Sequence, residues 1–199
     1  MATLQRPDYL VDGLFKRGFF YSITAKTGGG KTAVALLLAV AVADAKRRWK
    51  FGPHDVKHGR VAYITRENPD DAKERLVGMA EKMGFNTAEL DSTFLCIENV
   101  SDIAKAMDRI KREAEPFGDI SLVILDTSAA LFVGDDENSS IEMLKHAKVQ
   151  RSLTKLPGRL CVIALNHPIK HAAEPEQTPA ARRRRLPQRG GRQFHLMGA

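Results

Sequence analysis

The sequence has few cysteines, no long apolar segment and no internal repeat, and each absence excludes a class of protein. Its two cysteines, Cys96 and Cys161, both lie in apolar, strand-like runs. We interpret them as buried, reduced thiols, because a disulfide framework needs more cysteines and an oxidising compartment. The apolar run 33–43 is too short to span a bilayer, and residues 1–12 lack the apolar core of a signal peptide. We therefore expect a cytoplasmic protein without a membrane partner.

Acidic residues are absent from the last part of the chain, and this absence accounts for most of the net charge. Residues 179–199 hold six arginines, at Arg182, Arg183, Arg184, Arg185, Arg189 and Arg192. The whole chain carries +7, which leaves about +1 for residues 1–178. Net charge therefore says nothing about what the body of the chain binds. We expect one domain over residues 1–178 and a disordered basic tail over residues 179–199.

A glycine-rich loop lies between an apolar run and a long helical segment. Its residues are Ala25, Lys26, Thr27, Gly28, Gly29, Gly30, Lys31 and Thr32. They match the phosphate-binding pattern G-x-x-x-x-G-K-[ST], except that the small residue Ala25 replaces the first glycine. Glycines let backbone N–H groups converge on an anion, and the helix that follows adds the positive end of its dipole. Lys31 would then contact the terminal phosphates and Thr32 would ligate Mg²⁺. The alternative is a glycine-rich turn that happens to precede a lysine.

Apolar runs of strand length alternate with helical segments along the chain. We predict strands at 19–24, 60–65, 93–97, 120–126 and 160–165, and helices from the loop to about 48, at 69–83, between 101 and 116, and from about 140 to 156. Residues 1–18 would be a lead-in and residues 51–55 a loop. Asn68 suits the start of the second helix and Gly84 suits its end. The pattern predicts an α/β fold with a mostly parallel sheet and helices on both faces.

Polar residues follow the carboxyl ends of three more strands, where parallel sheets bind ligands. Asp126 ends an apolar strand in the Walker B manner and would hold Mg²⁺ near Thr32, although an aspartate after an apolar run is common in α/β proteins. Glu67 would orient the attacking water, or else it only favours the start of the next helix. Asn166 and His167 would contact the γ-phosphate, or else form a polar turn.

Four segments together resemble the RecA-like ATPases, and more narrowly the RepA-type hexameric helicase ATPases of plasmids and phages. They are residues 18–32, residues 61–69 with Arg75, residues 125–127 and residues 164–170, and the resemblance covers about residues 8–172. It implies ATP and Mg²⁺ as cofactors and Glu67 as the residue that activates water. It also implies that His167 senses the γ-phosphate, and it leaves the role of Asn166 open. Such proteins form homohexamers on single-stranded DNA and take an arginine finger from the next subunit, but no residue here matches a finger motif.

The sequence of the tail differs from that of this family, whose members continue at this point with a glycine-rich segment and further strands. With one choice of codons, the stretch from Arg182 read one base later encodes such a segment, Gly-Gly-Gly-Ala-Phe. We hypothesise that the chain after about Pro179 is translated out of frame and that the C-terminal strands are missing. The alternatives are a basic arm on nucleic acid and a solvated, disordered tail.

The sequence thus predicts an ATPase that is the motor core of a DNA helicase or replication-initiation protein. In this prediction Lys31 and Glu67 act at the reaction centre. Two other classes stay open. A P-loop kinase would phosphorylate a small molecule, and a nucleotide-binding module would lack motor activity.

Overall fold

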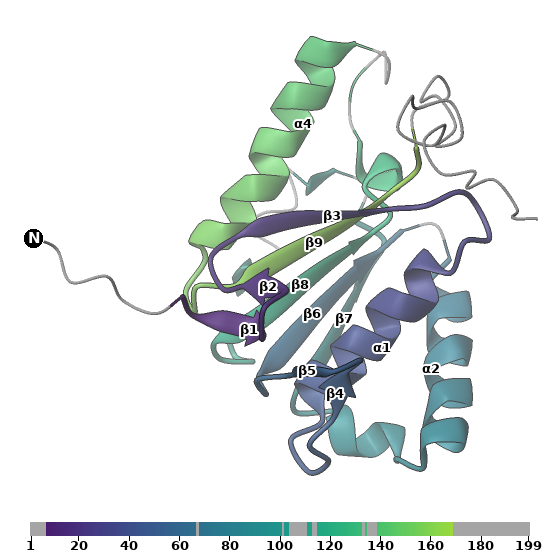
Figure 1. Cartoon of the computed structure of the whole chain (residues 1–199). Helices are drawn as coiled ribbons and strands as arrows, with labels where there is room; N and C mark the ends of the chain where they lie inside the picture. Colours follow the sequence, from purple (N-terminus) through teal and green to yellow (C-terminus); the bar gives the residue numbers. More distant parts are fainter. Residues whose placement is uncertain are drawn as a thin grey trace, which may run out of the picture. The chain divides into compact units, whose positions relative to one another are not determined.

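Five parallel strands form the central sheet (Figure 1). The computed structural model describes residues 7–66, 68–100, 102–103, 111–112, 115–132, 134 and 139–168. The strands lie in the order β3 (Phe20–Thr24), β9 (Cys161–Asn166), β8 (Ile120–Asp126), β6 (Arg60–Thr65) and β7 (Phe94–Glu98), and all neighbours are parallel. The predicted sheet is therefore confirmed, and each predicted strand lies within a residue of its observed bounds.

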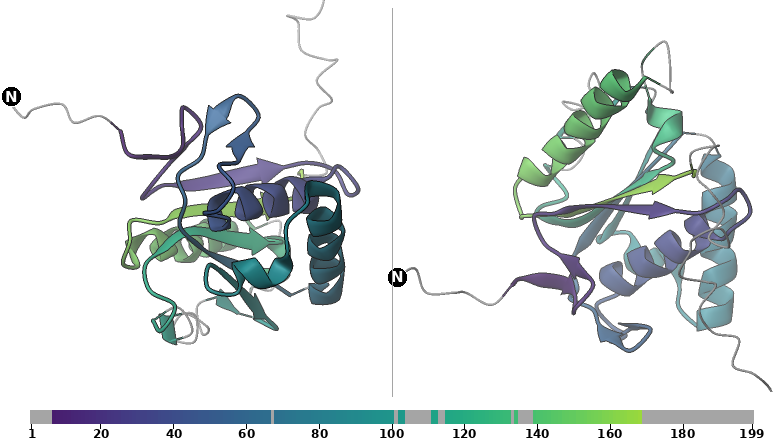
Figure 2. Two further views of the ribbon diagram at one scale, coloured as in Figure 1. Left: turned by 90° about the horizontal axis from the view of Figure 1, so that it is seen from below. Right: turned by 45° about the horizontal axis from the view of Figure 1, so that its top comes forward.

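Helices cover both faces of this sheet (Figure 1 and Figure 2). On one face lie α1 (Lys31–Ala43) and α2 (Pro69–Met83); on the other lies α4 (Ser140–Ser152), followed by the short helix η3 (Leu153–Lys155). Alternate residues of β6 serve different layers, since Tyr63 packs in the core beside α1 and Ile64 packs in the core beside α4. All of β8 is buried, as expected of a central strand. This is the predicted three-layer α/β fold.

Two short antiparallel hairpins stand where the sequence predicts a lead-in and a loop. β1 (Tyr9–Val11) pairs with β2 (Phe15–Lys16), and β4 (Lys50–Phe51) pairs with β5 (His54–Asp55). Each turn holds a glycine with positive φ, 72° at Gly13 and 61° at Gly52. The turn residues are visible in the sequence, but strands this short have no alternation that could reveal them.

The first helix is shorter than predicted. It ends at Ala43 rather than near residue 48, because Asp44 leaves the helical conformation at ψ 93°. Its carboxylate accepts hydrogen bonds from the backbone N–H groups of Lys46 and Arg47, at 3.0 and 3.2 Å. A side chain that binds the backbone ahead of it in this way competes with the helix and ends it.

The second helix has the predicted bounds. Gly84 ends it in the left-handed conformation at φ 71°, as predicted, whereas Asn68 holds the N-cap position without a side-chain capping bond. The helix predicted between Ser101 and Pro116 falls mostly outside the described residues. Contacts divide the chain into residues 1–168 and 169–199, and the second part, with the predicted tail, lies outside the described residues. In the described part, every helix is too short or too polar to cross a bilayer.

Candidate nucleotide-binding site

The glycine-rich loop joins β3 to α1 in a conformation that needs its glycines. Gly28 and Gly30 have φ of 76° and 78°, a region that other residues rarely adopt. A side chain on Gly29 would bring its Cβ within 2.9 Å of the Lys26 carbonyl oxygen. The backbone at Gly29 therefore packs closely against the backbone at Lys26. Such tight turns direct the N–H groups of a loop toward one point.

The start of α1 is electrostatically suited to an anion. Gly30 occupies its N-cap and supplies no side-chain acceptor, and its first turn contains no acidic residue. The first turn of α2, by contrast, contains Asp70 and Asp71. Acidic side chains near a helix start offset its positive potential, so α1 keeps that potential for a bound anion and α2 does not.

Carbonyl groups of the loop backbone hold the side chain of Lys31 in place. Its ammonium nitrogen donates to the carbonyl oxygens of Ala25 at 2.7 Å and Lys26 at 3.2 Å, and it lies 3.5 Å from Nδ1 of His167. The residue is 7% exposed. A buried ammonium group needs such partners, and they fix the positive charge at the mouth of the loop.

A cavity of about 270 Å³ opens beside the loop, and the ends of three strands meet around it. Residues 27–33 line it together with Thr65 at the end of β6, Asp126 at the end of β8, and His167 just after β9. The structure thus brings together the loop, Lys31, Thr32, Asp126 and His167, which the sequence assigns to one site. The carboxyl ends of parallel strands meet at one edge of a sheet, which explains why residues so far apart converge.

Asp126 is nearly buried, 7% exposed, and its Oδ2 accepts a hydrogen bond from the Tyr63 hydroxyl. Asp126 and Thr32 line the same cavity. Carboxylate and hydroxyl oxygens are the ligands that Mg²⁺ prefers, and the loop beside them offers backbone N–H donors to phosphate. The residues present therefore fit a Mg²⁺-bound nucleotide.

Three predicted residues contribute only indirectly to the cavity. Ala25 and Lys26 supply the carbonyl oxygens that hold Lys31. Asn166 donates from its side-chain Nδ2 to the Ser22 hydroxyl at 2.6 Å, and its backbone carbonyl oxygen accepts a hydrogen bond from the backbone N–H of Ala25 at 3.3 Å. Asn166 thus anchors the start of the loop to β9, and its contact with a phosphate stays a prediction.

Glu67 lies outside the described residues. Thr65, two residues before it, and Asn68, the residue after it, both line the cavity. Its role as the residue that activates water therefore stays a prediction.

Three further residues bear on this site, although no sequence motif predicts a role for them there. Arg75 and Asp71, one turn apart on α2, both line the cavity, and Arg75 Nε donates to Asp71 Oδ2 at 2.6 Å. This hydrogen bond raises the pKa of Arg75. The third residue is Tyr63, the partner of Asp126. Asp71 and Arg75 are four residues apart on a helix that starts just after a strand, and this spacing is the sequence signal that could have indicated their contact.

A parallel sheet whose strand ends and glycine-rich loop enclose one cavity defines a P-loop nucleotide-binding protein. A family model described as AAA domain matches residues 1–173. The chain therefore belongs to the AAA domain family, a family of nucleotide-binding ATPases that usually act with Mg²⁺. A search of curated proteins found no significant match to the chain.

Proposed function

We propose that this chain is the ATP-hydrolysing motor core of a DNA helicase or replication-initiation protein of the RepA type. The observation that carries the hydrolysis part is the convergence of Asp126 and His167 on the cavity beside Lys31. A loop alone binds phosphate. A carboxylate for the metal and a polar side chain within reach of the last phosphate are further groups that phosphoryl transfer to water uses.

Each residue has a distinct task in this proposal. Lys31 and the backbone N–H groups of residues 28–32 offset the charge of the terminal phosphates, while Thr32 and Asp126 hold Mg²⁺. When bound, Mg²⁺ neutralises charge that develops between the last two phosphates. Glu67 orients the attacking water and accepts its proton, and His167 donates a hydrogen bond to the γ-phosphate.

The DNA and assembly parts of the proposal rest on the resemblance to the RepA-type ATPases. In that arrangement six copies form a ring around single-stranded DNA, and each site takes an arginine from the neighbouring copy. The resembling segments include the residues that form the cavity wall at three strand ends, which supports the closer comparison.

The test compares wild-type protein with Glu67→Gln in two assays. Binding of a fluorescent ATP analogue should change by less than about threefold, whereas phosphate release should fall about 100-fold, because the amide cannot accept a proton. Single-stranded DNA should stimulate wild-type phosphate release, and light scattering should report a larger particle when ATP is present.

Other outcomes would contradict the proposal. Unchanged phosphate release by Glu67→Gln would remove the role of Glu67. Transfer of labelled phosphate to a nucleoside instead of water would indicate a kinase. A monomer whose hydrolysis ignores DNA would indicate a nucleotide-binding module without motor activity.

A further inference from the structure

Tyr63 does not line the cavity beside the loop, but it contacts Asp126, which does. It is fully buried in β6, and its hydroxyl donates a hydrogen bond to Oδ2 of Asp126 in β8. The strand register explains the contact: Tyr63 lies opposite Ile124, so Asp126 is its diagonal neighbour on the same face of the sheet. Diagonal neighbours on one face of a sheet lie within reach of an aromatic side chain as long as tyrosine.

The aromatic ring of Tyr63 is held on its other side. It stacks on Phe94 of β7, with ring centroids 6.1 Å apart and an interplanar angle of 21°. The ring also lines a second, mostly apolar cavity of about 190 Å³, together with Leu36, Leu76 and Cys96. This cavity is distinct from the one beside the loop, so the ring packs against apolar groups while its hydroxyl points to the Walker B carboxylate.

The hydrogen bond constrains the orientation of the Asp126 carboxylate. The torsion that rotates a carboxylate about its Cβ–Cγ bond is soft, so an unsupported aspartate samples many orientations. A charge-assisted bond from a rigid donor to Oδ2 fixes this torsion and leaves Oδ1 as the oxygen for a metal ion or its water. The rigidity of the donor comes from a buried strand position and the stacked ring of Phe94.

We propose that Tyr63 is a positioning residue for the magnesium site: its hydroxyl holds Oδ2 of Asp126 so that the other carboxylate oxygen stays directed at Mg²⁺. This inference rests on the role of Asp126 in the proposed function. It adds a residue that touches neither nucleotide nor metal. Loss of a residue that hydrogen-bonds to a metal ligand and orients it commonly lowers metal affinity by 10–100-fold.

The test is Tyr63→Phe, which removes only the hydroxyl. Affinity for a fluorescent ADP analogue is titrated in excess Mg²⁺ and again in excess EDTA. We expect the affinity in Mg²⁺ to fall about tenfold, at the lower end of the range for such residues. We expect the affinity in EDTA to stay within about twofold of wild type, because the loop that holds the phosphates is untouched.

Two further variants separate positioning from packing. Phe94→Leu keeps the hydroxyl and its buried strand position but weakens the stack, so it should lower the melting temperature while costing less Mg²⁺-dependent affinity than Tyr63→Phe. In an Asp126→Asn background, Tyr63→Phe should cause no further loss, since the two residues act as one unit.

Three results would overturn the proposal. The first is a Tyr63→Phe protein that melts earlier but binds nucleotide in Mg²⁺ as wild type does, which would make Tyr63 a core residue alone. The second is an additive loss in the Asp126→Asn background. The third is wild-type protein whose nucleotide affinity does not depend on Mg²⁺, which would also overturn the proposed function; the first two would leave that function standing.

Discussion

The ammonium group of Lys31 lies 3.5 Å from Nδ1 of His167, a contact that joins the glycine-rich loop to the end of β9. Because an ammonium group can only donate, Nδ1 acts as the acceptor, which assigns the imidazole proton to Nε2. The Thr27 hydroxyl lies 3.5 Å from the same nitrogen. His167 is thus oriented by the loop through one nitrogen, and its Nε2–H is the group that can donate to a phosphate.

Lys31→Ala should abolish ATP binding. The change removes a positive charge from a nearly buried position and also the hydrogen bonds to the Ala25 and Lys26 carbonyl groups. A charge-assisted contact between the ammonium group and a phosphate oxygen contributes about 3 kcal/mol, so the affinity for ATP should fall at least about 100-fold. Isothermal titration with ATP and Mg²⁺ measures the effect. Lys82→Ala, at an exposed position on α2, is the control and should bind as wild type does. Retained affinity in the Lys31 variant would mean that the loop does not bind phosphate.

His167→Ala should separate binding from turnover. Lys31 and the loop N–H groups remain, so ATP affinity should change by less than about fivefold, while phosphate release should fall about 10–100-fold through the loss of one donor at the γ-phosphate. His167→Gln keeps an N–H donor and should recover part of the rate. His58→Ala, at an exposed position away from the cavity, should leave both quantities unchanged. Equal rates for His167→Ala and wild type would show that His167 is only a turn residue.

The sheet and the core of the site could be predicted because their signals are local. Five apolar runs of strand length, separated by helical segments, specify a parallel sheet, and such a sheet places every strand end at one edge. The positions of Asp126 and His167 after strands therefore indicated a place near Lys31, and the resemblance to the RepA-type ATPases favoured this reading of His167 over a polar turn. The glycine pattern gave the loop, since its backbone conformation excludes other residues at Gly28 and Gly30.

The parts that the sequence did not reveal depend on register and on side-chain competition. Tyr63 in a buried strand has the appearance of any core residue, and only its pairing opposite Ile124 places its hydroxyl beside Asp126. Asn166 pairs opposite Thr24 on the neighbouring strand β3, which brings its amide to Ser22. The early end of α1 depends on Asp44, a single polar residue in a segment whose alanines and lysines otherwise favour a helix.

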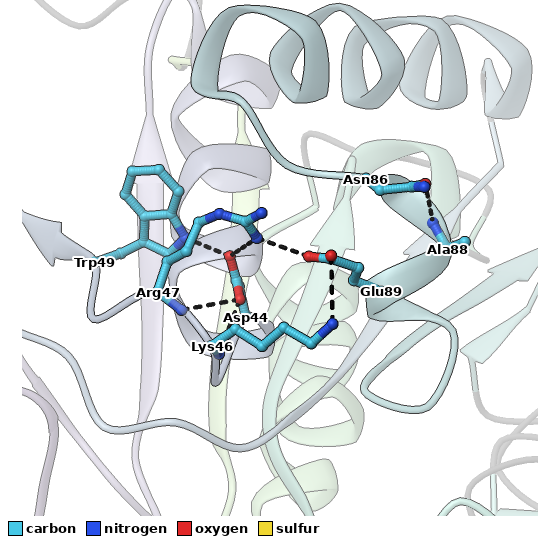
Figure 3. A network of polar contacts seen from close by, with 7 residues as sticks. All are labelled: Asp44, Lys46, Arg47, Trp49, Asn86, Ala88 and Glu89. Carbon is cyan, nitrogen blue, oxygen red and sulfur yellow. Dashed lines mark hydrogen bonds and ion pairs between the residues drawn. The ribbon is translucent and has the colours of Figure 1, made fainter.

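Asp44 is the centre of a polar network that ties the end of α1 to the short helix η1 (Thr87–Leu90) (Figure 3). Its side chain is 1% exposed, and it accepts hydrogen bonds from Trp49 Nε1 at 2.8 Å and from Arg47 Nη1 at 3.1 Å. The same Arg47 nitrogen contacts Glu89 at 2.8 Å. Burial by itself raises the pKa of the Asp44 carboxyl, but the bonds from Trp49, Arg47 and the backbone outweigh it, so this pKa lies below the ordinary value of 3.8.

Asp44→Asn should lower the free energy of unfolding by about 2 kcal/mol at pH 7, because it removes the charge that strengthens these buried bonds and turns an amide N–H toward donors. Asp55→Asn is the control. Asp55 is paired with Lys50 at 3.1 Å, but its side chain is 78% exposed, and the change should cost less than about 0.5 kcal/mol. Urea denaturation of the three proteins measures both effects, and equal midpoints for Asp44→Asn and wild type would contradict the assignment.

The same comparison should depend on pH in one direction. A carboxyl whose pKa is lower in the folded than in the unfolded chain stabilises the fold above its unfolded value, here 3.8, and loses that contribution as the pH falls through the lower folded value. The difference in free energy of unfolding between wild type and Asp44→Asn should therefore stay constant from about pH 7 to pH 5 and narrow below about pH 4. A difference that widens on acidification would mean that the folded protein favours the protonated carboxyl, the opposite of what the bonds from Trp49 and Arg47 imply.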